Sequence, residues 1–138
     1  LHYALSMGEF TEEEPVIVRV QTLNTLRDVL GTQIPDAPVG WSLQRSMARV
    51  AEEGHGVVVL LSQDETTEQL LEEVFAFPDV PQQVSAAGED GTQIYRLIGT
   101  GSQILKQLGI GKIRALSAPT RFNAISGFNL EVTEFIET

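Results

Sequence analysis

A chain of 138 residues has the length of one domain and can enclose a single hydrophobic core. With 42% hydrophobic and 20% charged residues it has globular composition, which excludes a disordered chain, and it contains no apolar run long enough for a membrane helix. The formal net charge of −10 disfavours nucleic-acid polymers as partners, because an acidic surface repels phosphate.

Three strands and two helices are expected in the first half of the chain. An apolar segment predicts a strand at 2–8, and the alternation at 15–22 predicts a second strand with one mostly polar face. A short helix is expected at 24–30. After a loop rich in proline and glycine, the helical period at 42–53 predicts an amphipathic helix that a glycine ends. The continuous apolar run at 57–61 predicts a buried strand.

The second half of the chain predicts three more helices and two strands. Helices are expected at 66–77, 101–108 and 120–126, and strands at 112–116 and 130–136. The polar stretch between the first two helices has weak strand character at best. In the helix expected at 66–77, the residues expected to face the core are Leu70, Leu71, Val74 and Phe77. The alternation of strands and helices favours an α/β fold with helices on both faces of the sheet.

No active site follows from local motifs alone. The pair Gly99 and Gly101 precedes a predicted helix and is a weak signal for a phosphate-binding turn; the alternative is close packing of the backbone. His2 and His55 lack metal-binding spacing and are expected to be solvated residues of a turn or edge. Because the chain has no cysteine, it has no disulfide or thiolate ligand, and the cytoplasm is the expected compartment.

Five framework segments, however, form a specific set. They are HYALSMGEF (2–10), EPVIVRVQT (14–22), ARVAEEGHGVVVLL (48–61), IGTGSQILKQLGIGKIRALS (98–117) and GFNLEVTEF (127–135). In order and in sequence they resemble GTP cyclohydrolase II from nearly end to end. The resemblance implies a three-layer α/β/α domain with a mixed sheet. Members of that family form dimers, bind GTP and use a zinc-activated water to open its imidazole ring.

The resemblance also places the zinc ligands of the family, three cysteines, on residues that cannot replace them. Asn24 stands at the first cysteine, and the region of the other two, 33–38, contains no sulfur. An Asn, an Asp and an Ile are poor substitutes for three thiolates around zinc. We therefore expect no metal site and no cofactor.

The nucleotide site of the family is equally changed. Segment 62–71 aligns with the family's RQEGRGIGLL loop but has lost both arginines and gained Glu65, and the catalytic Asp falls on Ile94. No catalytic set remains beyond a vestigial arginine, Arg96. The positions at which the resemblance leaves a nucleotide-binding side chain are Arg19, Gln63, Arg96 and Ser117.

These patterns predict one GTP cyclohydrolase II-like domain, 1–138, cut from a longer riboflavin-biosynthesis protein in which it follows a dihydroxybutanone-phosphate synthase domain. Its expected role is structural, dimerising or regulatory. One alternative is a sensor that binds a nucleotide or phosphometabolite through Arg19 and Arg96, and another is a remodelled hydrolase that uses Arg96. Expected partners are a second copy and the upstream synthase domain, with neither nucleic acid nor membrane. Trp41, Phe75 and Phe77 are candidate contact residues, although Trp41 fits a core position equally well.

Overall fold

The computed structural model describes residues 1–36, 40–62, 64–79, 91–117 and 129–138, and within 91–98 it describes the backbone only. The helix predicted at 120–126, most of the polar stretch 78–91, and Gln63 lie outside these residues. Among the described helices, none is long and apolar enough to cross a lipid bilayer.

All five predicted strands are present, and they form one mixed sheet in the order β1-β3-β2-β4-β5. The strands are β1 (Tyr3–Met7), β2 (Pro15–Thr22), β3 (Gly56–Leu61), β4 (Lys112–Leu116) and β5 (Glu131–Ile136). Strand β1 is antiparallel to β3, whereas the other neighbours are parallel. The carboxyl ends of β2, β3, β4 and β5 therefore meet at one edge of the sheet.

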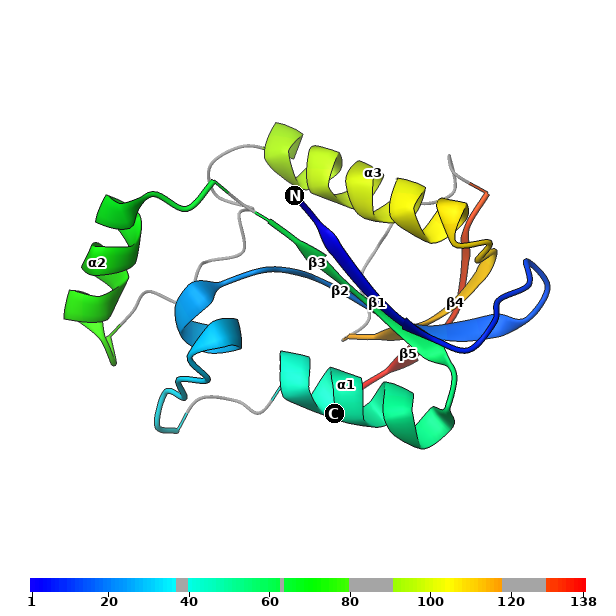
Figure 1. The fold of residues 1–138 in the computed structure, drawn as a ribbon, viewed down its shortest axis with the longest axis horizontal. Coiled ribbons are helices and arrows are strands. Elements are labelled where there is room, and N and C mark those ends of the chain that lie inside the picture. Colours follow the sequence, from blue (N-terminus) through cyan, green and yellow to red (C-terminus); the bar gives the residue numbers. More distant parts are fainter. Residues whose placement is uncertain (37–39, 63, 80–90, 118–128) are drawn as a thin grey trace.

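Two helices cover opposite faces of this sheet, which confirms the three-layer α/β/α prediction (Figure 1). Helix α1 (Leu43–Glu53) begins after Ser42, whose side chain accepts a hydrogen bond from the Arg45 backbone N–H, and ends at Gly54 with φ 71°. Helix α3 (Gly91–Gln107) lies on the other face. The short helix η1 (Thr25–Val29) follows β2, as predicted.

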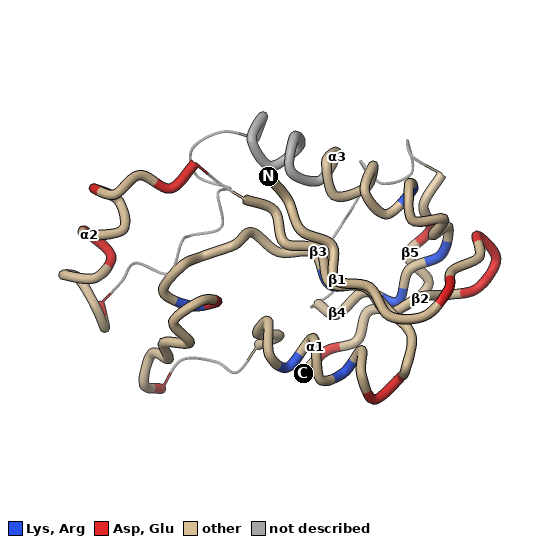
Figure 2. The backbone as a smooth tube through the Cα atoms, viewed as in Figure 1, with Lys and Arg blue, Asp and Glu red and all other residues tan. Residues whose placement is uncertain are grey.

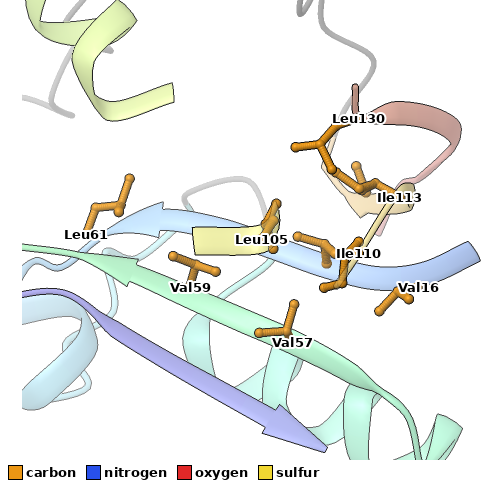
Figure 3. Packing of buried hydrophobic residues seen from close by; sticks show 10 residues of the cluster. Val16, Val57, Val59, Leu61, Leu105, Ile110, Ile113 and Leu130 are labelled. Carbon is orange, nitrogen blue, oxygen red and sulfur yellow. The ribbon is translucent and has the colours of Figure 1, made fainter. Parts of the chain in front are cut away.

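The core has one cluster of buried residues on each face of the sheet. Strand β3 is buried at all six positions and contributes alternate residues to both clusters, as its apolar run predicted. The cluster under α3, part of which Figure 3 shows, contains Val16, Val18, Val57, Val59, Leu61, Leu105, Ile110, Ile113, Ala115 and Leu130. The cluster under α1 contains Ile17, Val50, Val58, Leu60 and Leu116. Trp41 packs against the second cluster and donates its indole N–H to the carbonyl of Ile136 at 2.7 Å, so the core reading of this residue is correct.

The predicted start of the helix at 101–108 was wrong. Helix α3 begins at Gly91, so Gly99 and Gly101 lie inside it instead of preceding it. Gly101 is buried, and a Cβ atom there would lie 3.2 Å from Cγ1 of Val20. The glycine therefore allows close approach of helix and sheet and forms no phosphate-binding turn.

The predicted orientation of helix α2 (Thr67–Ala76) was also wrong. The helix exists and has a capping box between Thr66 and Gln69, but none of its residues is buried. It stands beside η1 at one end of the molecule and does not cover the sheet (Figure 1). Of the residues expected to face the core, Leu71, Val74 and Phe77 are exposed and Leu70 is half-buried.

Candidate functional site

The connections that leave β2 and β3 run to opposite faces of the sheet. Strand β2 leads through η1 to α1, whereas β3 leads through α2 to α3 on the other face. The two strands are parallel neighbours. In open α/β sheets, ligands bind outside the carboxyl ends of strands at such a switch point. The polar side chains at this edge therefore form the candidate site.

Arg19 lies near the carboxyl end of β2, on the face that α1 covers. Its Nη1 donates to the carbonyl of Leu116 at 2.9 Å, and its Nε donates to Oε1 of Gln21 at 3.0 Å. Burial lowers the pKa of the Arg19 guanidinium, the nearby Arg27 lowers it further, and Asp28 partly offsets both. Within the described part of the chain no carboxylate forms an ion pair with Arg19.

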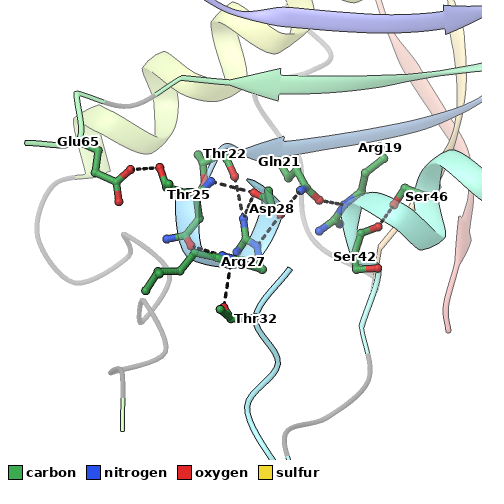
Figure 4. Close-up of polar contacts among 12 residues, drawn as sticks. Arg19, Gln21, Thr22, Thr25, Arg27, Asp28, Thr32, Ser42, Ser46 and Glu65 are labelled. Carbon is green, nitrogen blue, oxygen red and sulfur yellow. Dashed lines mark hydrogen bonds and ion pairs between the residues drawn. The ribbon is translucent and has the colours of Figure 1, made fainter. Parts of the chain in front are cut away.

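Asp28 is the centre of a polar network next to Arg19 (Figure 4). Its side chain is fully buried and accepts hydrogen bonds from Nε2 of Gln21 at 3.0 Å and from the backbone N–H of Asn24 at 2.8 Å. It also forms an ion pair with Arg27 at 2.9 Å. Gln21 thus connects the network to Arg19, and the polar groups at this edge are largely bonded to one another.

Asn24, which the sequence resemblance places at the first zinc cysteine of the family, forms two hydrogen bonds in this structure. Its Oδ1 accepts from the backbone N–H of Arg27 at 2.9 Å and caps η1, and its Nδ2 donates to Oε2 of Glu73 at 3.4 Å. The described residues include no group of three His, Cys, Asp or Glu side chains that could hold a metal ion. The residues present do not fit the zinc that the family fold implies.

A second hydrogen bond joins the segment after β3 to η1. Oγ1 of Thr25 donates to Oε2 of Glu65 at 2.6 Å. Glu65 is the acidic residue in the segment that resembles the family's GTP-binding loop, and Glu73 lies within α2, the helix that follows. We call these four residues, Asn24, Thr25, Glu65 and Glu73, the polar clasp, because they hold the 64–76 segment against η1.

The structure describes two of the four predicted nucleotide-binding side chains, Arg19 and Ser117, and it places Arg19 against the residue next to Ser117. Arg19 bonds to the carbonyl of Leu116, which immediately precedes Ser117. Gln63 and the Arg96 side chain lie outside the described residues, so their roles stay predictions. Arg96 itself lies within α3, and the helix N-terminus expected just after it does not exist.

Sequence reasoning missed Gln21, Arg27 and Asp28. The alternation of β2 places Gln21 on the face of Arg19, so this one was available from the pattern. Asp28 carried no such signal, since an acidic residue in a short helix is usually solvated. The two histidines bond to backbone, His2 with the N–H of Ser62 at 3.0 Å and His55 with the carbonyl of Glu9 at 2.6 Å, so both lie at the edge of the fold but neither is merely solvated.

Comparison with known proteins identifies the family. A sequence profile of GTP cyclohydrolase II matches residues 1–137. The chain belongs to the GTP cyclohydrolase II family. It is 45% identical over 136 residues to a 3,4-dihydroxy-2-butanone 4-phosphate synthase of Pseudomonas aeruginosa, a match that covers 99% of this chain and 35% of that protein. It is 33% identical to the riboflavin biosynthesis protein RibBA of Cytophaga hutchinsonii, covering 99% of this chain and 34% of that protein.

A solved structure gives the same result. RibBX, a two-domain 3,4-dihydroxy-2-butanone 4-phosphate synthase from A. baumannii, is 32% identical and superposes with a TM-score of 0.59, covering 98% of this chain and 31% of that one. The GTP cyclohydrolase II-like domain thus spans about a third of the length of the relatives that it matches.

Proposed function

We propose that this domain no longer runs the GTP cyclohydrolase II reaction and serves a structural or regulatory role for an attached dihydroxybutanone-phosphate synthase domain in riboflavin biosynthesis. The observation that carries the proposal is Asn24, an amide at the first zinc position that is already bonded to η1 and to Glu73. Without a thiolate set there is no zinc, and without zinc the attacking water loses its activation.

Two further observations support this proposal. The polar groups at the carboxyl edge bond mainly to one another, which leaves few of them for a substrate. The core is complete on both faces of the sheet, so the fold persists where the chemistry of the family does not. The proposal takes the attached activity from the names of the relatives. The P. aeruginosa protein is named as a dihydroxybutanone-phosphate synthase, and the match covers only 35% of its length.

The absence of zinc chemistry has a direct test. Metal analysis of the purified 138-residue chain is expected to give far less than one zinc per chain, and incubation with GTP is expected to release neither formate nor pyrophosphate. The reason is that no cysteine is present to hold the ion. One tightly held zinc per chain, or GTP turnover that Arg96→Ala abolishes, contradicts the proposal.

The supporting role is tested by deletion. A protein that joins this chain to the synthase domain, as in the relatives, is compared with the same protein lacking residues 1–138. Deletion is expected to change the number of subunits per assembly in light scattering, lower the melting temperature of the synthase, or reduce its rate, because a domain that associates stabilises its partner by mass action. If all three measurements stay unchanged, the proposal is wrong and a remodelled hydrolase becomes the better reading.

Arg19 favours one second candidate, a sensor for a nucleotide or other phosphate compound. Arg19 is half-buried, its hydrogen-bond partners are an amide and a backbone carbonyl, and no described carboxylate forms an ion pair with it. An anion at this edge would offset part of the burial cost. Glu65 and the net charge of −10 oppose such binding, which limits the affinity that this site can reach.

Calorimetric titration with GTP and GMP tests the sensor. The expected signal is weak binding with a dissociation constant of about 1 mM, equivalent to roughly −4 kcal/mol. Because Arg19 and Arg96 are the proposed anion contacts, Arg19→Ala and Arg96→Ala are each expected to remove the signal, whereas Arg45→Ala on α1 is expected to leave it unchanged. The absence of both heat and thermal shift at millimolar nucleotide eliminates this candidate.

A further inference from the structure

Helix α2 presents an apolar face that nothing in the described structure covers. The side chains of Leu71, Val74 and Phe75 are 48%, 45% and 84% exposed. Their spacing of i, i+3 and i+4 places them on one face of the helix. A surface helix normally buries such a face against its own core, so α2 has the opposite orientation.

The polar clasp explains how the helix is held in this orientation. Glu73 lies on the side of α2 that contacts η1, where it accepts from Asn24, and Glu65 just before the helix accepts from Thr25. Two hydrogen bonds therefore join the 64–76 segment to η1, and Leu71, Val74 and Phe75 are left on an exposed face of the helix. These hydrogen bonds lie where the sequence resemblance places the active site of the family, and they attach α2 there.

The charge around this face indicates the kind of partner. Every charged residue from Asp64 to Asp79 is acidic, and along α2 the backbone tube of Figure 2 has red segments, for Asp and Glu, and no blue ones. These residues are Asp64, Glu65, Glu68, Glu72, Glu73 and Asp79. A second copy would bring two such acidic segments together, which is unfavourable. A partner surface with lysine and arginine around an apolar groove is complementary, and helix-in-groove binding uses anchors at this spacing.

We propose that α2 docks through Leu71, Val74 and Phe75 into an apolar groove, bordered by basic residues, on the dihydroxybutanone-phosphate synthase domain. This inference rests on the proposed function and names its contact surface. Phe75, the most exposed of the three, is the expected anchor, because aromatic side chains at the centre of an interface supply much of its binding energy.

The test uses the joined protein described above with Leu71→Asp and Phe75→Asp. Met47→Asp is the matched control, because Met47 is an exposed apolar residue of a different helix, α1, with an exposed fraction of 46% against 48% for Leu71. Both α2 variants are expected to reproduce the effect of deleting the domain on synthase stability or assembly, whereas the control is expected to have none. The 138-residue chain alone is expected to keep its melting temperature in each α2 variant, since these side chains touch no core.

A second readout uses the absence of natural cysteine. The thiol of Phe75→Cys is expected to react with a maleimide about tenfold or more slowly in the joined protein than in the 138-residue chain, because docking protects it. Met47→Cys is expected to react at the same rate in both.

Three outcomes separate the two proposals. If deletion affects the synthase but the α2 variants do not, and Phe75→Cys stays fully reactive, the docking inference is wrong and the supporting role acts through another surface. If deletion itself has no effect, the proposed function is wrong and the inference with it. If Phe75→Cys is protected in the 138-residue chain alone, in proportion to a dimer seen by light scattering, the occupant is a second copy and the inference is also overturned.

Discussion

Replacing Asp28 with alanine is expected to lower the free energy of unfolding of this domain by about 3 kcal/mol. The change leaves two donors without an acceptor, the buried Nε2 of Gln21 and the part-buried backbone N–H of Asn24. Each unsatisfied buried donor costs about 1–3 kcal/mol. The lost ion pair adds little, because the Arg27 side chain is 49% exposed and can return to water. Urea unfolding of the purified chain measures the loss.

Glu53→Ala is the matched control for this experiment. Glu53 also bonds two side chains, Arg114 at 2.6 Å and Arg49 at 2.9 Å, but it lies at the surface. Hydrogen bonds from Arg114 and then Arg49 lower the pKa of its carboxyl, so its contribution is present at neutral pH and is lost as the pH falls through that lowered pKa. Solvent screens this contribution, and the loss at neutral pH is expected to be clearly smaller than for Asp28. Equal losses in the two variants would show that the buried network stabilises the domain no more than the surface ion pairs of Glu53 do.

The strands of this fold were predictable because their signal is local. The alternation of β2, the apolar run of β3 and the glycine that ends α1 are each contained in a short segment of the chain. The long-range hydrogen bonds at the carboxyl edge were not predictable, because they join residues that are distant in the sequence. Thr25 and Glu65 are 40 residues apart, and Arg19 and Leu116 are 97 apart. Local pattern contains no information on such pairs.

The errors on α2 and α3 have separate physical causes. For α2, the apolar residues at helical spacing predicted a face toward the core, but the helix lies beside η1 and does not cover the sheet. The periodicity identified the helix correctly and said nothing about which surface it would meet. For α3, two glycines suggested the start of a helix, because glycine weakens a helix interior by about 1 kcal/mol relative to alanine. The close approach of Gly101 to Val20 explains why glycine occurs there.

The second large effect is expected in the core on the α3 face. Leu105 is 3% exposed and lies one helical turn after Gly101, where α3 comes close to the sheet (Figure 3). Leu105→Ala removes side-chain atoms from the cluster that joins this helix to the strands, and the tight approach of the backbone limits how far the site can collapse around the cavity.

The free energy of unfolding is therefore expected to fall by about 3–4 kcal/mol, a large part of the 5–15 kcal/mol that stabilises a typical domain. Gln103→Ala, an exposed change on the same helix, is expected to have little effect on the urea midpoint. A loss below about 1 kcal/mol for Leu105→Ala would mean that α3 is loosely packed. In the joined protein, Leu105→Ala is expected to weaken the synthase only at temperatures where this domain has unfolded, whereas Phe75→Asp is expected to act while it is still folded. This difference in temperature distinguishes loss of the folded state of the domain from loss of contact through the α2 surface.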